Sequence, residues 1–252
     1  NASNLDIRIE LHKKYSQNPV SWFDWIFRKL HLSAGDEILE VGCGTGALWK
    51  GHEDQIPHGV HITLSDRSEG MVKDARKLLG DGKGVFSYET FPCEKIPKEK
   101  EKYDLVIANH VLFYLKDRQE ALREIKRVLK PGGMFLCSTY GSRHMQEITR
   151  MVQEFDQRIT LSANHLYEEF GLENGKEQLM DVFSDVQRED YEDELLVDQP
   201  EPLISYILSC HGNQHEYLAS RYLEFKEFVR RRVEEEGRMK ITKNAGIFLC
   251  RG

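Results

Sequence analysis

Three glycines at every second position follow a short apolar run and form the most informative local pattern of the chain. The run is residues 37–41, and Gly42, Gly44 and Gly46 come directly after it. A strand has no need of glycine, whereas a backbone that turns sharply and lies against a ligand needs positions without a Cβ atom. Glu40 adds a carboxylate beside the turn. The pattern predicts a nucleotide-binding turn between a strand and a helix.

An acid at the end of the next apolar run supports a ligand at this turn. Asp66 ends the run 60–66 and stands 20 residues beyond Gly46. At the end of a second strand, such an acid can take both hydroxyls of a ribose. The glycine turn also satisfies the permissive dinucleotide fingerprint. At this point a nicotinamide cofactor therefore stays open, as does a dehydrogenase reaction.

Three side chains are candidates for moving a proton. His110 directly follows Asn109, the last residue of the apolar run 103–109. The carboxyl end of a central strand is where ligands of open α/β sheets bind, which makes His110 the best placed of the three. Tyr15 and His144 are the other two. For each of them, packing or exposure to solvent is the alternative role.

The elements that position these residues alternate along the chain. Apolar or alternating runs, separated by stretches with helical spacing or turn residues, give a βαβαβ rhythm that predicts a parallel sheet. The later runs are apolar almost throughout, as strands covered on both faces should be. The expected strands are residues 37–41, 60–66, 85–89, 103–109 and 133–140.

Two connecting helices have clear start and stop signals. Ser68 is expected to cap a helix that Gly80 ends. Asp117, with Glu120 as its capping partner, is expected to begin a second helix, which Pro131 and the two glycines after it stop. Both helices carry an apolar stripe at helical spacing.

Outside this core the chain is mainly helical. The expected helices are residues 143–157, 172–182 and 214–236, the last with Leu218, Tyr222, Phe225 and Val229 on one face. Residues 245–250 are expected to form a final strand. Aromatic residues nearly encircle a helix around residues 22–27, and such a helix must be covered.

The chain resembles the class I S-adenosylmethionine-dependent methyltransferases over residues 36–140. The family's Glu-x-Gly-x-Gly-x-Gly pattern stands at residues 40–46, and residues 103–115 and 129–133 are similar to its fourth strand with the following loop and to the turn before its fifth strand. Residues 91–97 look like its adenine-binding segment, with Pro92 where an aspartate is common. These segments favour S-adenosylmethionine over a nicotinamide cofactor.

The resemblance implies a fold and a domain organisation. The expected fold is α/β, a Rossmann-like three-layer sandwich with a seven-stranded, mostly parallel sheet whose last strand is antiparallel. A single methyltransferase domain would span residues 1–252, with a helical lid at 1–35, the cofactor-binding core at 36–140, a helical insertion at 141–182 and the rest of the sheet with a long helix at 183–252.

The resemblance also implies which residues hold the cofactor. Glu40 and the backbone carbonyl of Asn109 would meet the ammonium group, the glycine turn would lie along the methionine portion, and the backbone N–H of Cys93 would face the adenine. The full set of cofactor-binding candidates is Glu40, Gly42, Cys43, Gly44, Gly46, Asp66, Arg67, Cys93, Glu94 and Asn109. The product would be S-adenosylhomocysteine.

The expected acceptor is a small molecule, methylated at oxygen, nitrogen or carbon by in-line displacement. The Asn/Asp-Pro-Pro-Tyr/Phe motif of many nucleic-acid and protein amide methyltransferases is not found after residue 108. A net charge of -7 with scattered basic residues also disfavours nucleic acid. Methylation of RNA or protein, and a module that binds the cofactor without transferring a group, remain the alternatives.

Cysteines and hydropathy bear on the compartment and on metals. Five cysteines without a C-x-x-C pair indicate reduced thiols and a cytoplasmic protein. No apolar stretch approaches the roughly 20 residues that span a bilayer. No metal-ligand spacing appears, so a metal-assisted reaction is not expected.

Overall fold

The computed structural model describes residues 2–162 and 165–252, and these residues form two compact units. The sheet unit contains residues 22–140, 167–190 and 245–252. The helical unit contains residues 2–21, 141–162, 165–166 and 191–244. All the residues that the sequence predicts to hold the cofactor lie in the sheet unit, and so does His110, whereas Tyr15 and His144 lie in the helical unit.

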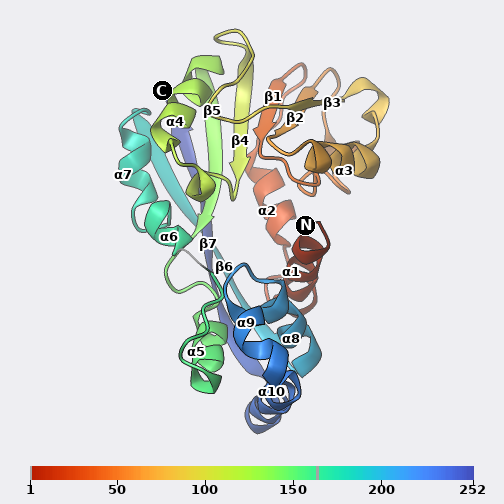
Figure 1. Ribbon diagram of the computed structural model, residues 1–252. Coiled ribbons are helices and arrows are strands. Elements are labelled where there is room, and N and C mark those ends of the chain that lie inside the picture. Colours follow the sequence, from red (N-terminus) through yellow and green to blue (C-terminus); the bar gives the residue numbers. More distant parts are fainter. Residues whose placement is uncertain (1, 163–164) are drawn as a thin grey trace. The chain divides into compact units, whose positions relative to one another are not determined.

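Within the described residues the strands form one seven-stranded sheet with the order β3-β2-β1-β4-β5-β7-β6 (Figure 1). Strands β1 to β5 pair in parallel, and β7 runs antiparallel to β5, which confirms the expected sheet. The strands are β1 (Glu37–Val41), β2 (His61–Asp66), β3 (Phe86–Thr90), β4 (Tyr103–Asn109), β5 (Leu129–Tyr140), β6 (Asp185–Val197) and β7 (Met239–Arg251).

The strand order determines where a ligand can bind. From β1 the chain proceeds to β2 and β3 on one side, whereas β4 and β5 lie on the other side of β1. Such a reversal between neighbouring parallel strands opens a crevice at their carboxyl ends, the usual ligand site of open α/β sheets. The glycine turn follows β1 and Asn109 ends β4, so both predicted elements lie at the carboxyl ends of these two neighbouring strands.

The helices α3 (Glu69–Leu79) and α4 (Arg118–Val128) begin at the predicted caps. The Ser68 hydroxyl accepts from the backbone N–H of Met71 at 3.4 Å, and the Asp117 carboxylate accepts from Glu120 N–H at 3.0 Å. Gly80 ends α3 with φ of 63°. In Figure 1, α3 lies beside β2 and β3, and α4 lies beside β5, as their contacts also indicate.

The short helices of the sheet unit complete its layers. They are α2 (Trp22–Lys29), α6 (Leu166–Glu169) and α7 (Gly175–Met180), and the turn η3 (Leu112–Tyr114) follows β4. Ile26 of α2 is fully buried among strand residues such as Ile38 and Ile62, while its aromatic neighbours are partly buried against the same core. This confirms a covered helix at residues 22–29.

The helical unit has its own apolar core. It contains α1 (Ala2–Tyr15), α5 (Gln146–Phe155), α8 (Pro200–Ser209), α9 (Gln214–Leu218) and α10 (Tyr222–Glu236). Both α1 and α10 pack against α8. Leu11, Ile148, Ile207, Phe225 and Val229 are among the buried residues of this core.

Several predicted boundaries were wrong, and tertiary contacts explain the clearest case. The helix expected at 214–236 is interrupted by a 3-10 turn at Ala219–Arg221, and Tyr222 is exposed instead of facing the core. The Arg221 guanidinium bonds both Asp156 and Glu224, so side-chain contacts fix the start of α10. The helix expected to continue to residue 130 ends at Val128, because β5 already begins at Leu129.

The helix expected directly after the glycine turn is not formed, because residues 42–52 are turns and irregular backbone that lead into a 3-10 turn at Glu53–Gln55. The other expected helices are shorter than their patterns. The pattern at 143–157 yields α5 at Gln146–Phe155, and that at 172–182 yields α7 at Gly175–Met180. Over residues 2–162 and 165–252, no helix has both the length and the apolar character needed to cross a membrane.

Candidate cofactor and acceptor site

At each position of the turn after β1 there is a separate physical reason for glycine. All three have positive φ, 65° at Gly42, 55° at Gly44 and 79° at Gly46. A Cβ at Gly42 would lie 2.4 Å from a methyl group of Val111, and one at Gly46 would lie 2.8 Å from Leu79 of α3. A Cβ at Gly44 would meet no atom within 4 Å. The outer glycines therefore allow close packing, while Gly44 presents bare backbone to open space.

Hydrogen bonds tie this turn to the end of β2. The backbone N–H of Cys43 donates to Ser65 O at 2.9 Å, and that of Gly44 donates to Asp66 Oδ2 at 3.1 Å. The other carboxylate oxygen of Asp66 accepts from the N–H of Ser68 at 2.8 Å. Because each carboxylate oxygen has two lone pairs, both remain able to accept from a ligand. Asp66 thus shapes the turn and keeps acceptor capacity beside it.

Glu40 is a buried carboxylate with neutral side-chain partners. It is 2% exposed, and its oxygens accept from Trp49 Nε1 at 2.7 Å and from Asn109 Nδ2 at 3.4 Å. Burial raises its pKa to about 7; the two hydrogen bonds oppose this shift, and the charge of Asp66 adds to it. A cationic group bound here would offset the cost of burying the charge.

Asn109 adds a buried acceptor without a hydrogen-bond donor next to Glu40. Its Nδ2 is used by Glu40, whereas its Oδ1 is buried and has no hydrogen-bond partner among the described residues. Leaving a buried acceptor unpaired costs free energy, so such an atom indicates a missing donor. A carboxylate and an amide oxygen side by side fit a ligand ammonium group.

The segment after β3 borders the same edge of the sheet. The backbone N–H of Phe91 donates to Asp66 O at 3.2 Å, which joins this segment to the end of β2. Cys93 is buried, its thiol contacts Glu94 Oε2 at 3.7 Å, and burial raises its pKa to about 12, so it remains a neutral thiol. Glu94 is half-buried, and Arg67 is exposed next to Asp66.

His110 lies in an aromatic cluster directly after Asn109. Its backbone has φ of 53°, and its N–H donates to the Ser138 hydroxyl at 3.0 Å. Its ring stacks on Trp22 of α2, with centroids 5.4 Å apart, and lies 6.0 Å from Phe113 and 6.2 Å from Tyr140. These four residues, called the aromatic wall below, place planar apolar surface beside the end of β4.

Tyr15 and His144 belong to the helical unit. Tyr15 is 5% exposed within the core of that unit, and its hydroxyl contacts Gln199 Oε1 at 3.4 Å. His144 stacks on His12 with centroids 6.0 Å apart, and its Nδ1 accepts from the backbone N–H of Asn244 at 3.2 Å. The roles predicted for these two side chains remain predictions.

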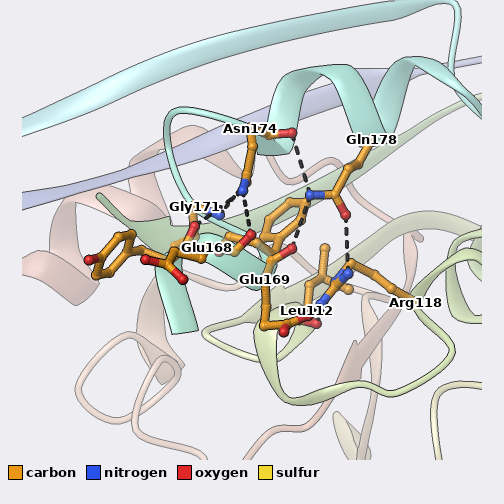
Figure 2. A network of polar contacts seen from close by, with 10 residues as sticks. Leu112, Arg118, Glu168, Glu169, Gly171, Asn174 and Gln178 are labelled. Atoms are coloured by element: carbon orange, nitrogen blue, oxygen red, sulfur yellow. Dashed lines mark hydrogen bonds and ion pairs between the residues drawn. The ribbon is translucent and has the colours of Figure 1, made fainter. Parts of the chain in front are cut away.

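A polar network that the sequence did not indicate fixes the loop after β4 (Figure 2). Arg118, the first residue of α4, donates from Nε to Leu112 O at 2.9 Å, from Nη1 to Gln178 at 3.2 Å and from Nη2 to Glu169 at 3.3 Å. Gln178 also donates to the backbone of Glu169 at 3.0 Å. One guanidinium thus joins η3, α6 and α7.

Trp49 is the other site residue that the sequence did not indicate. It stands nine positions after Glu40 in a segment without helical or strand periodicity, so no sequence pattern marks it. Only the fold brings its indole to the carboxylate. In the part of the chain that the structure describes, no three His, Cys, Asp or Glu side chains gather where they could hold a metal ion.

Comparisons with known proteins bear on the class of domain that carries this candidate site. Residues 39–137 match the family model described as "Methyltransferase domain". The chain is 30% identical over 161 residues to the ubiquinone/menaquinone biosynthesis C-methyltransferase UbiE of Geobacter sulfurreducens, covering 63% of this chain and 60% of that protein. It is 31% identical over 149 residues to the malonyl-[acyl-carrier protein] O-methyltransferase of Bacillus anthracis, covering 58% and 52%. The chain thus spans little more than half the length of these relatives.

A solved structure gives the same fold. The structure superposes with a TM-score of 0.54 on a SAM-dependent methyltransferase from Aquifex aeolicus, at 15% identity and covering 76% of this chain and 91% of that one. The strand order, the turn after β1 and the matched domain together define a Rossmann-like methyltransferase fold. Residues 39–137 are thus similar to the methyltransferase domain family, within a sheet that has the fold of S-adenosylmethionine-dependent methyltransferases.

Proposed function

We propose that this protein transfers a methyl group from S-adenosylmethionine to a small-molecule acceptor. The observation that carries the donor assignment is the pair of buried acceptors at the ends of β1 and β4. The Glu40 carboxylate and the Oδ1 of Asn109, which has no hydrogen-bond partner within residues 2–162 and 165–252, suit an ammonium group, as at the amino-acid end of this donor. A bound nicotinamide dinucleotide would bring no ammonium group to them.

The remaining contacts follow the length of the donor. The bare backbone at Gly44 leaves room for the chain between the amino acid and the ribose, and Asp66 can accept from both ribose hydroxyls. The buried segment at Cys93 and Glu94 is proposed to line the adenine. Arg67 and Cys43 complete the proposed binding set beside Asp66 and the turn.

Methyl transfer from a sulfonium group needs little covalent assistance from the protein. When bound, S-adenosylmethionine supplies a methyl group on a sulfonium leaving group, which an acceptor atom displaces in line. The chain's own residues orient the acceptor and exclude water, and orientation can supply much of the rate enhancement. If the acceptor must lose a proton, His110 is the proposed base, since it follows Asn109 and its ring is held by stacking on Trp22.

The aromatic wall supports a small acceptor with an apolar or planar part. Trp22, His110, Phe113 and Tyr140 gather beside the end of β4, and none of these four residues is Lys or Arg. A site that tracks a nucleic-acid backbone would instead need Lys or Arg there. The relatives named above are a C-methyltransferase and an O-methyltransferase, which leaves both carbon and oxygen as proposed acceptor atoms.

The deciding experiment has two steps. Melting the protein with S-adenosylhomocysteine and, separately, with NAD tests the donor site, because a ligand that binds the folded state raises the melting temperature. Only S-adenosylhomocysteine should stabilise it. Protein incubated with a metabolite extract and a donor carrying a labelled methyl group should then label a small molecule. Label found only in macromolecules would contradict the small-molecule proposal, and binding without any label would favour a non-catalytic module.

A further inference from the structure

Trp49 is buried in the apolar core of the sheet unit but carries one polar atom, and that atom reaches the candidate donor site. Its ring is fully buried and makes edge contacts with Phe27, at 6.2 Å and 88°, and with Phe86, at 6.3 Å and 63°. The indole N–H donates to Glu40 Oε2 at 2.7 Å. Packing alone does not require an N–H group at this position.

The segment around Trp49 is held from the side of α2. The ring of His52 stacks on Phe27 with centroids 4.2 Å apart and an interplanar angle of 5°. His52 contacts Leu48 O through Nδ1 and Asp24 Oδ1 through Nε2, both at 2.9 Å. The indole is thus fully buried between ring contacts with Phe27 and Phe86, and its N–H donates to Glu40.

We propose that Trp49 is a positioning residue for the methyl donor, which holds the Glu40 carboxylate charged and aimed at the ammonium group of the donor. The inference rests on the proposed role of Glu40. A hydrogen bond to a charged carboxylate in a low-dielectric site is among the stronger ones that a protein makes. Without it, Glu40 would have only the longer contact with Asn109 to offset its burial.

The charges around Glu40 make this role measurable. Its pKa is raised to about 7 by burial first, and the Trp49 hydrogen bond is the largest of the opposing influences. Asp66 is the charged group that raises this pKa further, and Cys43, a neutral thiol whose own pKa burial raises, is the other titratable neighbour. Removing the indole N–H must therefore raise the pKa of Glu40.

The test measures affinity for S-adenosylhomocysteine by calorimetry from pH 5.5 to 9. In the wild-type protein, a plot of the logarithm of affinity against pH should bend near pH 7. Below this bend the affinity should fall about tenfold per pH unit, because the ammonium group must displace a proton from Glu40. Trp49→Phe should move the bend to higher pH by about one unit or more and weaken binding at pH 7 about fivefold or more, and the two affinities should converge at pH 9. Trp25→Phe, a matched change in α2, should leave the bend in place.

Glu40→Gln separates the two proposals. If Glu40→Gln removes the bend while Trp49→Phe leaves it at the wild-type pH, Trp49 is only a core residue and the inference fails alone. If Glu40→Gln keeps the bend, the proposed donor site itself fails. Should Trp49→Phe not fold, the indole N–H resonance of Trp49 in the wild-type protein decides: it should titrate near pH 7 and stop titrating when S-adenosylhomocysteine is bound, and a flat resonance would contradict the inference.

Discussion

The backbone N–H of Gly44 donates to the carboxylate of Asp66 at 3.1 Å, so the two residues most diagnostic of a nucleotide site support each other directly. One belongs to the turn after β1 and the other ends β2. The Asp66 carboxylate therefore has a structural role before any ligand binds. It fixes the position of the turn and faces the same opening.

Replacing Asp66 should weaken the donor site strongly. Asp66→Ala removes the acceptors proposed for the ribose hydroxyls and also the partner of Gly44, so affinity for S-adenosylhomocysteine should fall roughly 10- to 100-fold. Glu69→Ala is the matched control, since Glu69 is an exposed acid at the start of α3. Calorimetry on both variants checks this, and equal affinities would contradict the role of Asp66.

Glu40 should make the stability of the ligand-free protein depend on pH. Between about pH 4.5 and 7 the folded protein holds more of the Glu40 proton than the unfolded chain, so the free energy of unfolding should decrease as the pH rises through this window. The Glu40→Gln variant has no titrating group at this position, so its stability does not decrease in this way. The difference between its free energy of unfolding and that of the wild-type protein should therefore rise by about 3 kcal/mol from pH 4.5 to 7.5.

Urea unfolding followed by tryptophan fluorescence measures this difference. Trp22, Trp25 and Trp49 are the three tryptophans of the chain, and all belong to the sheet unit that contains Glu40. Unfolding curves whose separation does not change with pH would show that Glu40 titrates alike in the folded and unfolded states.

The glycine turn should separate stability from binding. In Gly44→Ala the only strain is the positive φ, so the substitution should lower the free energy of unfolding by about 1 kcal/mol. Its methyl group would nevertheless fill the open space beside Gly44 and reduce donor affinity. Gly42→Ala adds the clash with Val111 and should cost about 3 kcal/mol. Val111→Ala should recover part of that loss in the double variant. Denaturation and calorimetry together check this, and equal stabilities of the two alanine variants would contradict it.

Arg118 should control the order of the loop after β4. Arg118→Lys keeps the charge but cannot bond Leu112, Gln178 and Glu169 together, because lysine lacks the planar fork of donors. Backbone amides at residues 111–116 should then exchange hydrogen faster, by about tenfold, while affinity for S-adenosylhomocysteine stays within about twofold. Arg123→Lys on the exposed side of α4 is the control. Unchanged exchange in Arg118→Lys would show that η3 holds its shape without the network.

Local patterns predicted the frame of this protein. The capping of α3 by Ser68 and of α4 by Asp117, the stop at Gly80 and the positions of β1 to β4 all depend on neighbours within a few residues, and these were confirmed. The glycine turn belongs to the same class, since the need for backbone without Cβ is local. The break at Ala219–Arg221 could not be predicted, because its cause is the contact of Arg221 with Asp156, 65 residues away.

The sequence by itself therefore determined the cofactor class and the edge of the sheet where the proposed cofactor site lies. Only the tertiary structure decided the electrostatics of that site. Whether Glu40 is buried, that Trp49 and Asn109 are its partners, and that His110 stacks on Trp22 all depend on strand order and helix packing. Periodicity records which face of an element is buried, but it carries no information on which distant side chain will lie against that face.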